Sequence, residues 1–471
     1  MPAISKLAQS NTVIAPDMPG QGLSSPFQNG PTLDKFVGAL HEIVNVLNLE
    51  SFHLAGHGAG AALALAYTAR HRHRVAGLDL RDVPAATDPE RTYPKLEPSS
   101  DGSHLATIWN LVRSRYVFHP WYETSVAHRL VSAVPGPRQL HTEVMAILNS
   151  ADYGCLGRAV SDHDWQAEAR HYSELTSSPS TPVVPSTEIA IPLPPSEKGT
   201  ISRFYCNTSQ GQIHFRESGH RSGRPLLMIH ESPGSARLLE SHILEFGLKR
   251  WVLAPDTLGN GLSDDPQRPD ANIEFYSDIL TEALDLLRIP EVDVFGSHTG
   301  ALIGMELAIK QPRRCRNLVM EGITLFPAEE AAEYASPRYL RPIEPDEFGC
   351  YLLQAWGMQR DMQLFWPWYN RTPQGARNLE LEAVGGLHTR VVDFLNSGST
   401  YPISYRAAYL YPAAERIRSL GVRTLLCAYV NDVLRPFVEQ AAGINPHVAT
   451  KVLRQREDLT AVCETFFDGQ A

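Results

Sequence analysis

The sequence predicts an α/β fold in which helices connect the strands of a mostly parallel sheet, and it predicts this fold twice in one chain. Three observations support this prediction. Short apolar runs alternate with stretches of helical periodicity, which is typical of parallel sheets buried on both faces. A glycine-rich turn follows an apolar run at two places, and the motifs around that turn recur in the same order about 240 residues later.

The composition is that of a globular protein with two or three domains, since 43% of the 471 residues are hydrophobic and 20% are charged. A net charge of -10 argues against nucleic acid or an anionic membrane as a main partner. No apolar run reaches the ~18 residues of a membrane span, and the N-terminal segment lacks a signal-peptide stretch. The six cysteines lie far apart without metal-ligand spacing, which predicts a cytoplasmic protein without a metal site.

The repeat is visible by direct comparison. VIAPD at residues 13–17 reappears as VLAPD at 252–256, and FHLAGHGAGAALAL from Phe52 matches VDVFGSHTGALIGMEL from Val292. Further along, the PWY triplet at 120–122 recurs 247 residues later. A drift of seven residues over about 140 positions indicates a tandem duplication.

The two copies differ in extent. Residues 1–185 form an incomplete first copy with about three strands, 186–199 form a Pro/Ser-rich linker, and 200–471 form a nearly complete second copy. Only the second copy has the alternating stretches RFYCNTS and GQIHFRES, which favour an antiparallel hairpin. The first copy retains at most residues 181–184 of the section that ends the second copy.

Five further apolar runs in the second copy predict buried strands: PLLMIH, WVLAPD, VDVFG, NLVMEG and RTLLCAYV, followed by HVATKVLR. About 100 residues of helical pattern with many aromatics separate NLVMEG from RTLLCAYV. An insertion at that point lies over the carboxyl edge of the sheet, and it predicts a helical lid at about 326–415.

This order of hairpin, His-containing loop, D-x-x-G-x-G-x-S turn, strand, G-x-x-x-G helix and inserted lid resembles the α/β-hydrolase superfamily. It is most similar to the lidded group with haloalkane dehalogenases, epoxide hydrolases and proline iminopeptidases. The resemblance covers nearly all of the second copy and the middle of the first. It implies an α/β-hydrolase fold present twice, cofactor-free chemistry on a small molecule, and a nucleophile at the centre of G-x-S-x-G.

The position of the nucleophile does not follow the pattern of the family. The second copy reads GSHTG at 296–300, so His298 takes the central place and Ser297 stands one position early, pointing away from the pocket. The first copy has Gly58 at its centre, which predicts a catalytically inert copy. Asp432 fits the place of the family's acid, but no histidine follows Val452, so two members of the triad are missing.

The loop that begins at His230 keeps the form of an oxyanion loop. Backbone N–H groups near Glu231 and Ser232, together with that of Thr299, are placed to hold an oxygen that carries negative charge. His230 is a catalytic candidate, although such a histidine usually supports the loop by bonding to backbone.

Four further residues are candidates for the site, and three of them have two interpretations. Asp256 either orders its turn or contacts the substrate. Glu321 reaches the same rim and is a catalytic candidate that pairs with His298. Trp368 and Tyr369 either pack the lid internally or form a flat apolar wall for a hydrophobic substrate.

Two functions are compatible with this pattern. An imidazole with an unperturbed pKa near ~6.5 suits proton transfer, which favours an enzyme of hydrolase or lyase type acting on a small hydrophobic carbonyl or ester-like molecule. The alternative is a catalytically dead protein that binds a small molecule or acts as a scaffold. The first copy either covers the second copy or mediates homodimerisation. A third interpretation is that the given chain is incomplete, because the first copy begins at what should be its fourth strand.

Overall fold

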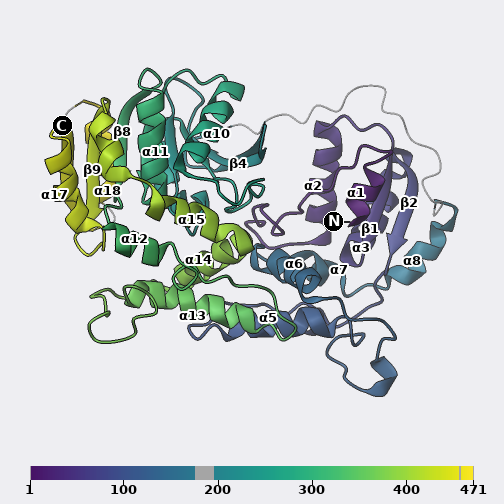
Figure 1. The fold of residues 1–471 in the computed structure, drawn as a ribbon. Coiled ribbons are helices and arrows are strands. Elements are labelled where there is room, and N and C mark those ends of the chain that lie inside the picture. Colours follow the sequence, from purple (N-terminus) through teal and green to yellow (C-terminus); the bar gives the residue numbers. More distant parts are fainter. Residues whose placement is uncertain (1, 176–195, 456–457, 470–471) are drawn as a thin grey trace. The chain divides into compact units, whose positions relative to one another are not determined.

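The computed structural model describes residues 2–175, 196–455 and 458–469, which form two compact units. The first unit contains residues 1–192 and 346–349, and the second contains 193–345 and 350–471 (Figure 1). Most of the predicted linker at 186–199, and the segment 181–184, lie outside the described residues. Within the described residues, no helix combines the length and apolarity needed to cross a bilayer.

The second unit is built around an eight-stranded sheet. Its spatial order is β10-β9-β8-β7-β5-β6-β4-β3. The strands are β3 (Ser202–Thr208), β4 (Gly211–Ser218), β5 (Leu226–Ile229), β6 (Val252–Pro255), β7 (Val292–Ser297), β8 (Cys315–Glu321), β9 (Arg423–Tyr429) and β10 (Val448–Leu453). The pairs β3–β4 and β4–β6 are antiparallel and the other pairs are parallel, so the predicted hairpin and parallel sheet are present.

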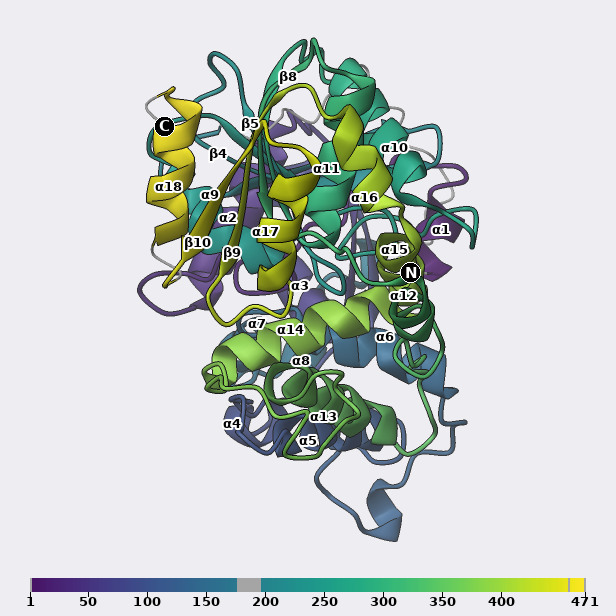
Figure 2. The ribbon, with the colours of Figure 1, turned by 60° about the vertical axis from the view of Figure 1, so that its left-hand side comes forward.

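Helices cover both faces of this sheet. One core contains residues of α10 (Ile273–Leu286), α11 (Thr299–Lys310) and α17 (Arg435–Ile444). The other core contains residues of α9 (Glu240–Gly247) and α18 (Asp458–Phe467). Figure 2 shows α17 and α18 on opposite sides of β9 and β10. The central strands are buried on both faces, as their continuous apolar runs predict.

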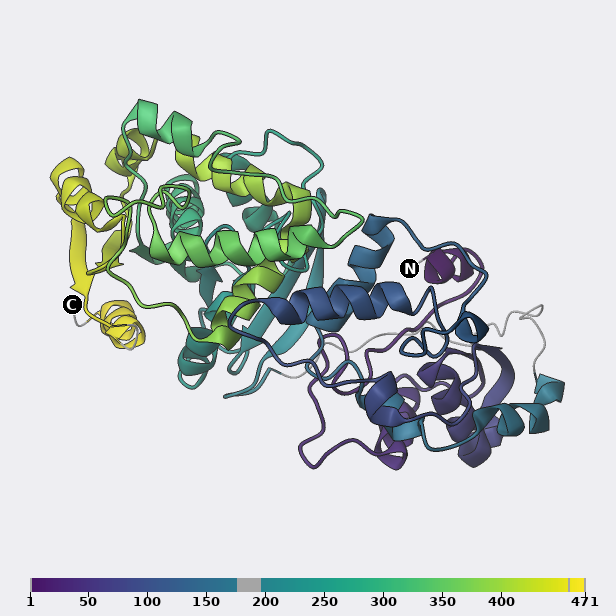
Figure 3. The same ribbon diagram turned by 90° about the horizontal axis from the view of Figure 1, so that it is seen from below.

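The segment between β8 and β9 is helical, as predicted. It contains α12 (Ala328–Tyr334), α13 (Cys350–Leu364), α14 (Val384–Ser397), α15 (Tyr401–Leu410) and α16 (Ala413–Arg416). Seen from below in Figure 3, the green helices of this insertion lie in front of the sheet of the same unit. The insertion therefore contributes side chains at the carboxyl end of the parallel strands.

The first unit has a smaller sheet. Two parallel strands, β1 (Phe52–His57) and β2 (Val75–Arg81), pair with each other. Its helices are α1 (Pro2–Leu7), α2 (Leu33–Val46), α3 (Ala59–His71), α4 (Pro89–Thr92), α5 (Ser103–Ser114), α6 (Pro137–Leu148), α7 (Cys155–Val160) and α8 (Trp165–His171). A core of its own forms around Phe36, Tyr67 and Leu78.

The prediction of about three strands in the first copy is wrong by one strand. Residues 13–17, which match β6 in sequence, form no strand. In the second unit β6 pairs with β4 and β5, and the described part of the first unit contains no counterpart of either. An extended segment without a neighbour cannot form a ladder of hydrogen bonds.

The repeat seen in the sequence is also a structural repeat. The elements α2, β1 and β2 begin 240 residues before α10, β7 and β8, and α5 and α6 begin 247 residues before α13 and α14. Even single contacts recur at this spacing. The indole N–H of Trp121 donates to the carbonyl of Thr92 at 3.1 Å, and that of Trp368 donates to the carbonyl of Tyr339 at 2.9 Å.

Candidate active site

The strand-to-helix elbow of the second unit is formed by the tight junction between β7 and α11. His298 lies at this junction with φ 48° and ψ -104°, in a left-handed region that a non-glycine residue rarely adopts. The flanking glycines are required, because a Cβ at Gly296 would lie 2.3 Å from the carbonyl oxygen of Gly300. Ser297 is buried at the end of β7, but it lines the same cavity as His298, so the prediction that it points away from the pocket is wrong.

His298 contacts carboxylates on both sides of its ring. Its Nε2 lies 3.0 Å from Oδ2 of Asp432, which follows β9, and its Nδ1 lies 3.6 Å from Oε2 of Glu231. Asp432 is fixed in turn, since its Oδ1 accepts the backbone N–H of Leu434 at 2.6 Å. Glu321, at the end of β8, joins the group: one donor atom each of His298, Glu321 and Asp432 lie within 4.8 Å of one another.

These carboxylates change the protonation of the imidazole. Burial alone would lower the pKa of His298, but Asp432 first, and then Glu321 and Glu231, raise it to about 10. The three carboxylates therefore favour the protonated form of the ring. This corrects the premise of an unperturbed imidazole, because the sequence does not show that three carboxylates surround it.

The pKa values of the three carboxyl groups shift in opposite directions. Burial raises the pKa of Glu321. Burial also acts to raise the pKa of Asp432 and Glu231, but His298 lowers that of Asp432, and Arg390 with His298 lowers that of Glu231. The site thus contains a protonated imidazole beside one carboxyl group with raised pKa and two with lowered pKa.

Arg390 of α14 connects the insertion to the oxyanion loop. Its Nη1 donates to Oε1 of Glu231 at 2.7 Å, and its Nε donates to Oε2 of Glu382 at 2.8 Å. Glu231 therefore lies between two cations, Arg390 and His298. Neither Arg390 nor Glu382 is a candidate that the sequence alone identifies.

The three backbone positions predicted to hold an oxyanion lie together. Glu231, Ser232 and Thr299 all line the same cavity as His298. Thr299 is the first residue of α11, where a backbone N–H has no partner within the helix. Whether these backbone N–H groups hold an oxygen with negative charge stays a prediction.

His230 has a supporting position. Its Nε2 accepts the backbone N–H of Thr257 at 2.9 Å, and its Nδ1 lies 2.6 Å from the carbonyl oxygen of Glu231. This pattern requires a neutral ring with the proton on Nδ1, and burial lowers the pKa of His230. The catalytic prediction for His230 is corrected, because both ring nitrogens hold backbone groups and the residue does not line the cavity.

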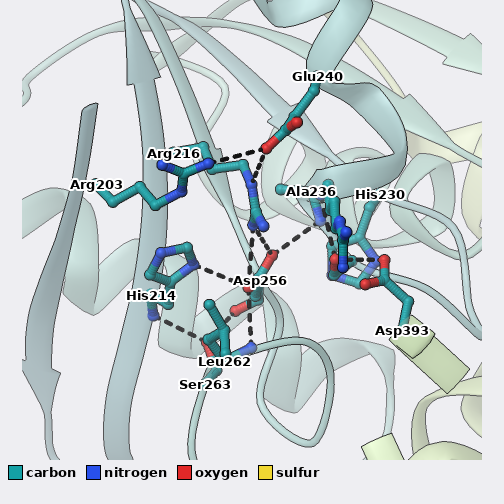
Figure 4. A network of polar contacts seen from close by, with 12 residues as sticks. Arg203, His214, Arg216, His230, Ala236, Glu240, Asp256, Leu262, Ser263 and Asp393 are labelled. Carbon is teal, nitrogen blue, oxygen red and sulfur yellow. Dashed lines mark hydrogen bonds and ion pairs between the residues drawn. The ribbon is translucent and has the colours of Figure 1, made fainter. Parts of the chain in front are cut away.

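Asp256 is also an internal residue (Figure 4). Its carboxylate is buried, with Oδ2 at 2.9 Å from Nδ1 of His214 and Oδ1 at 3.1 Å from Nη1 of Arg216. It also accepts the backbone N–H groups of Ala236 and Leu262. The predicted substrate contact of Asp256 is therefore corrected to its other interpretation, which is that it orders the turn.

Trp368 and Tyr369 lie outside the residues that line the cavity. Trp368 is buried, and the ring of Tyr369 stacks under the guanidinium of Arg338 at 4.2 Å. The first unit repeats this contact between Arg91 and Tyr122 at 4.1 Å. The substrate wall predicted at Trp368 and Tyr369 is corrected, because the repeat shows a packing motif that is independent of the site.

The cavity at the elbow has a volume of about 580 Å³, which is within the usual range for small-molecule sites. On the side of the insertion it is lined by aromatic residues, namely Tyr339, Trp366, Tyr405 and Tyr409, and by the polar residues Gln359, Arg377 and Arg390. None of these residues is a site candidate in the sequence alone. Comparing the two copies could have found Gln359 and Arg377, since Val112 and Leu130 stand at the positions 247 residues earlier.

One group of side chains has the donor atoms for a cation. Among the described residues, His298, Glu321 and Asp432 are the group that could hold a metal ion. The protonated imidazole already balances part of the negative charge there, and a metal ligand would have to be neutral imidazole. The absence of a metal and of a cofactor stays a prediction.

Comparison with known proteins agrees with this architecture. The family model described as "alpha/beta hydrolase fold" matches residues 2–104 and 225–341. The chain is 38% identical over 114 residues to 2-hydroxymuconate semialdehyde hydrolase of Pseudomonas sp. (strain CF600), covering 24% of this chain and 40% of that protein. It is 29% identical over 139 residues to haloalkane dehalogenase 2 of Mycobacterium tuberculosis (strain ATCC 25618 / H37Rv), covering 30% and 48%.

A solved structure also resembles the chain. Epoxide hydrolase A from Mycobacterium thermoresistibile has 20% identity and a TM-score of 0.45, over 57% of this chain and 99% of that one. The chain spans less than half the length of the two curated relatives named above. One of these relatives is a hydrolase by name and the other a dehalogenase, and the family model matches at two separate regions. The two regions matched by the family model fit an α/β-hydrolase fold that is present twice in the chain.

Proposed function

We propose that the second unit is an enzyme that acts on a small hydrophobic carbonyl or ester-like molecule by acid–base chemistry of hydrolase or lyase type. One observation carries this proposal. His298 occupies the strained elbow position, faces the cavity and is paired through Nε2 with Asp432 at 3.0 Å. Positive φ in a non-glycine residue has a cost of about 1–3 kcal/mol, which is tolerated mostly at functional positions.

In this proposal His298 acts as an acid. Because its pKa is raised to about 10, the imidazolium delivers a proton or a hydrogen bond to an oxygen that becomes negative, and Asp432 orients the ring. Backbone N–H groups at Thr299 and in the loop at Glu231 support the same oxygen. Glu321, whose pKa is raised by burial, is the candidate base.

The relatives support the class of reaction. The name of one of them describes hydrolysis of a semialdehyde, a carbonyl compound. A second candidate function is favoured by the charge pairing at His298, since both ring nitrogens face carboxylates. A permanently paired imidazolium also suits a catalytically dead protein that binds a small molecule.

The test is turnover by the full chain of a panel of esters, epoxides and vinylogous diketones, comparing wild type with His298→Ala. We expect the variant to lose about 10²- to 10⁴-fold in rate, which is the usual contribution of a positioned acid or base. The matched control is His57→Ala, because His57 adjoins the elbow of the first unit and forms an exposed pair with Asp82 at 2.7 Å. This control should keep full activity.

A fluorophosphonate probe for serine hydrolases should leave the protein unlabelled, since His298 and Gly58 stand at the two elbow centres. Full turnover in His298→Ala, with an unchanged melting temperature, would instead favour the binding protein. Stoichiometric labelling of Ser297 would show that the elbow presents the serine and not the histidine.

A further inference from the structure

Two donor groups on the insertion side of the cavity have no hydrogen-bond partner. Gln359 of α13 is 5% exposed, and its Nε2 is buried and unpaired. Arg377, in the segment after α13, donates through Nη1 to the carbonyl of Met362 at 2.9 Å, while its buried Nε has no acceptor. Buried polar groups are rarely left unpaired in folded proteins, and both of these residues line the same cavity, so the two donors point to a ligand at this place.

Among the described residues, the guanidinium of Arg377 also forms no direct ion pair, although it acts on Asp432 through space. Arg390 forms ion pairs with both Glu231 and Glu382, whereas no carboxylate of the described residues forms an ion pair with Arg377. A planar guanidinium with a fixed Nη1 and an unpaired Nε is suited to donate hydrogen bonds to an oxygen atom of a ligand that lies in its plane.

The scaffold does not need these two groups. The positions 247 residues earlier are Val112 and Leu130, which are apolar. Around them the first unit keeps the same framework: the bridge between Phe118 and Arg129 repeats that between Phe365 and Ala376. Gln359 and Arg377 are therefore polar additions to a framework that folds without them.

We propose that Arg377 and Gln359 bind a carboxylate of the ligand, so that the substrate is a small carboxylic acid with an apolar body. The aromatic residues Tyr339, Trp366 and Tyr409 of the same cavity contact that body. The inference rests on the proposed function only in placing the reacting carbonyl at His298. It adds the class of substrate.

A monoanion fits the charge of the cavity better than a phosphate does. Glu231, Glu321 and Asp432 line the same space, and they would repel a dianion. Arg377 supplies one positive charge that acts on Asp432 through space but forms no direct ion pair among the described residues, and one carboxylate matches it.

The first test compares neutral and charged probes on the full-length protein by isothermal calorimetry. Benzoate is paired with benzamide, and hexanoate with hexanamide, so that shape is kept and charge is changed. We expect each carboxylate to bind at least about tenfold more tightly than its amide, as a hydrogen bond to a charged group implies. Equal binding of acid and amide, or no binding of either acid, overturns the proposal.

The second test uses variants. Arg377→Gln should weaken carboxylate binding about tenfold or more and leave amide binding unchanged, and Gln359→Leu should weaken it less. Arg360→Gln is the matched control, because Arg360 is an exposed neighbour on α13 that does not line the cavity. Equal losses in Arg377→Gln and Arg360→Gln would show a general charge effect and overturn the subsite. The melting temperature of each variant without probe reports its folding.

The two proposals fail separately. His298→Ala should lose turnover but keep the preference for carboxylate over amide. If Arg377→Gln loses the preference for carboxylate over amide while His298→Ala keeps full turnover, the carboxylate subsite is supported and the proposed function is wrong. Normal discrimination in Arg377→Gln together with inactive His298→Ala removes the subsite alone.

Discussion

The two elbows of this chain have nearly the same backbone conformation but different residues at their centres. Gly58 has φ 57° and ψ -124°, and His298 has φ 48° and ψ -104°. The N–H of Gly58 donates to the carbonyl of Arg81 at 3.0 Å, and that of His298 to the carbonyl of Glu321 at 2.7 Å. The elbow conformation is therefore a property of the junction between strand and helix. The side chain placed there is an independent feature of the second copy.

The glycine-rich turns show the same contrast. Ser24 Oγ donates to the carbonyl of Asp17 at 2.7 Å, and Ser263 Oγ to that of Asp256 at 2.6 Å, so both turns close identically. The carboxylate of Asp17 is exposed, whereas that of Asp256 is buried with His214 of β4 as a partner. A turn forms from local contacts, but a buried charge needs the complete sheet.

The largest expected effect concerns independent folding. Residues 196–471 contain the eight-stranded sheet and both cores, so this fragment should unfold cooperatively when expressed alone. Residues 1–185 contain a two-stranded sheet in which β1 alternates between half-buried and exposed residues. We expect this fragment to be largely unprotected in amide hydrogen exchange. A soluble 1–185 fragment with strong protection in β1 would mean that the first copy is an autonomous domain.

The second effect separates the two aspartates. Asp256→Asn removes the charge that neutralises the buried Arg216, and such uncompensated charge has a cost of about 3–5 kcal/mol. Asp17→Asn should change the free energy of unfolding by less than about 0.5 kcal/mol, as expected for an exposed side chain. Urea unfolding of both variants in the full chain measures this difference.

The contribution of Asp256 to the free energy of unfolding also depends on pH. Its pKa is lowered in the folded state: burial opposes this, but Arg216 and His214 outweigh it. The stabilisation is therefore present above the ordinary aspartate pKa and is lost as the pH falls below it. Equal effects of Asp17→Asn and Asp256→Asn would contradict the claim that the sheet, and not the turn, determines the difference.

The features that the sequence predicts correctly are those that depend on local motifs. The hairpin, the elbow and the parallel sheet follow from patterns within short segments, and the pairing of His298 with a carboxylate follows from the positions of Asp432 and Glu321 at strand ends. The strand wrongly predicted at 13–17 has a non-local cause, because a strand needs neighbours and the described residues of its unit offer none.

The features that the sequence does not predict lie mostly in the insertion between β8 and β9. Trp366 lines the cavity while Trp368, two residues later, packs inside the insertion between β8 and β9. Which of the two faces the site depends on how helices of the insertion pack, and no periodicity encodes that. The charge of His298 depends likewise on Glu231 and Asp432, which are 67 and 134 residues away in the sequence.

A third and smaller effect tests the ion pairing at His298. Its pKa is raised in the folded state to about 10, so the stabilisation is complete below the unfolded value near ~6.5 and is lost as the pH rises toward 10. The difference in unfolding free energy between wild type and His298→Gln should fall over this range. We expect about 1–2 kcal/mol, because the side chain is 30% exposed and solvent screens the pair. A difference that stays constant or grows from pH 6.5 to 10 would show that the histidine is neutral.

The smallest expected effect isolates the backbone of the elbow. Gly58→Ala places a Cβ at a position with no heavy atom within 4 Å, so crowding contributes nothing and only the positive φ remains. The expected loss is about 1 kcal/mol in the free energy of unfolding, with catalytic activity unchanged. Gly38→Ala is the matched control. Its Cβ also meets nothing within 4 Å, but Gly38 lies inside α2 with negative φ, so the substitution should stabilise the helix by about 0.5–1 kcal/mol. Opposite signs in the two variants would assign the cost to backbone conformation alone, and His298 bears the same cost in the second copy. If Gly58→Ala were neutral, the elbow of the first copy would relax freely, and the strain at His298 would no longer be evidence that its side chain is retained for function.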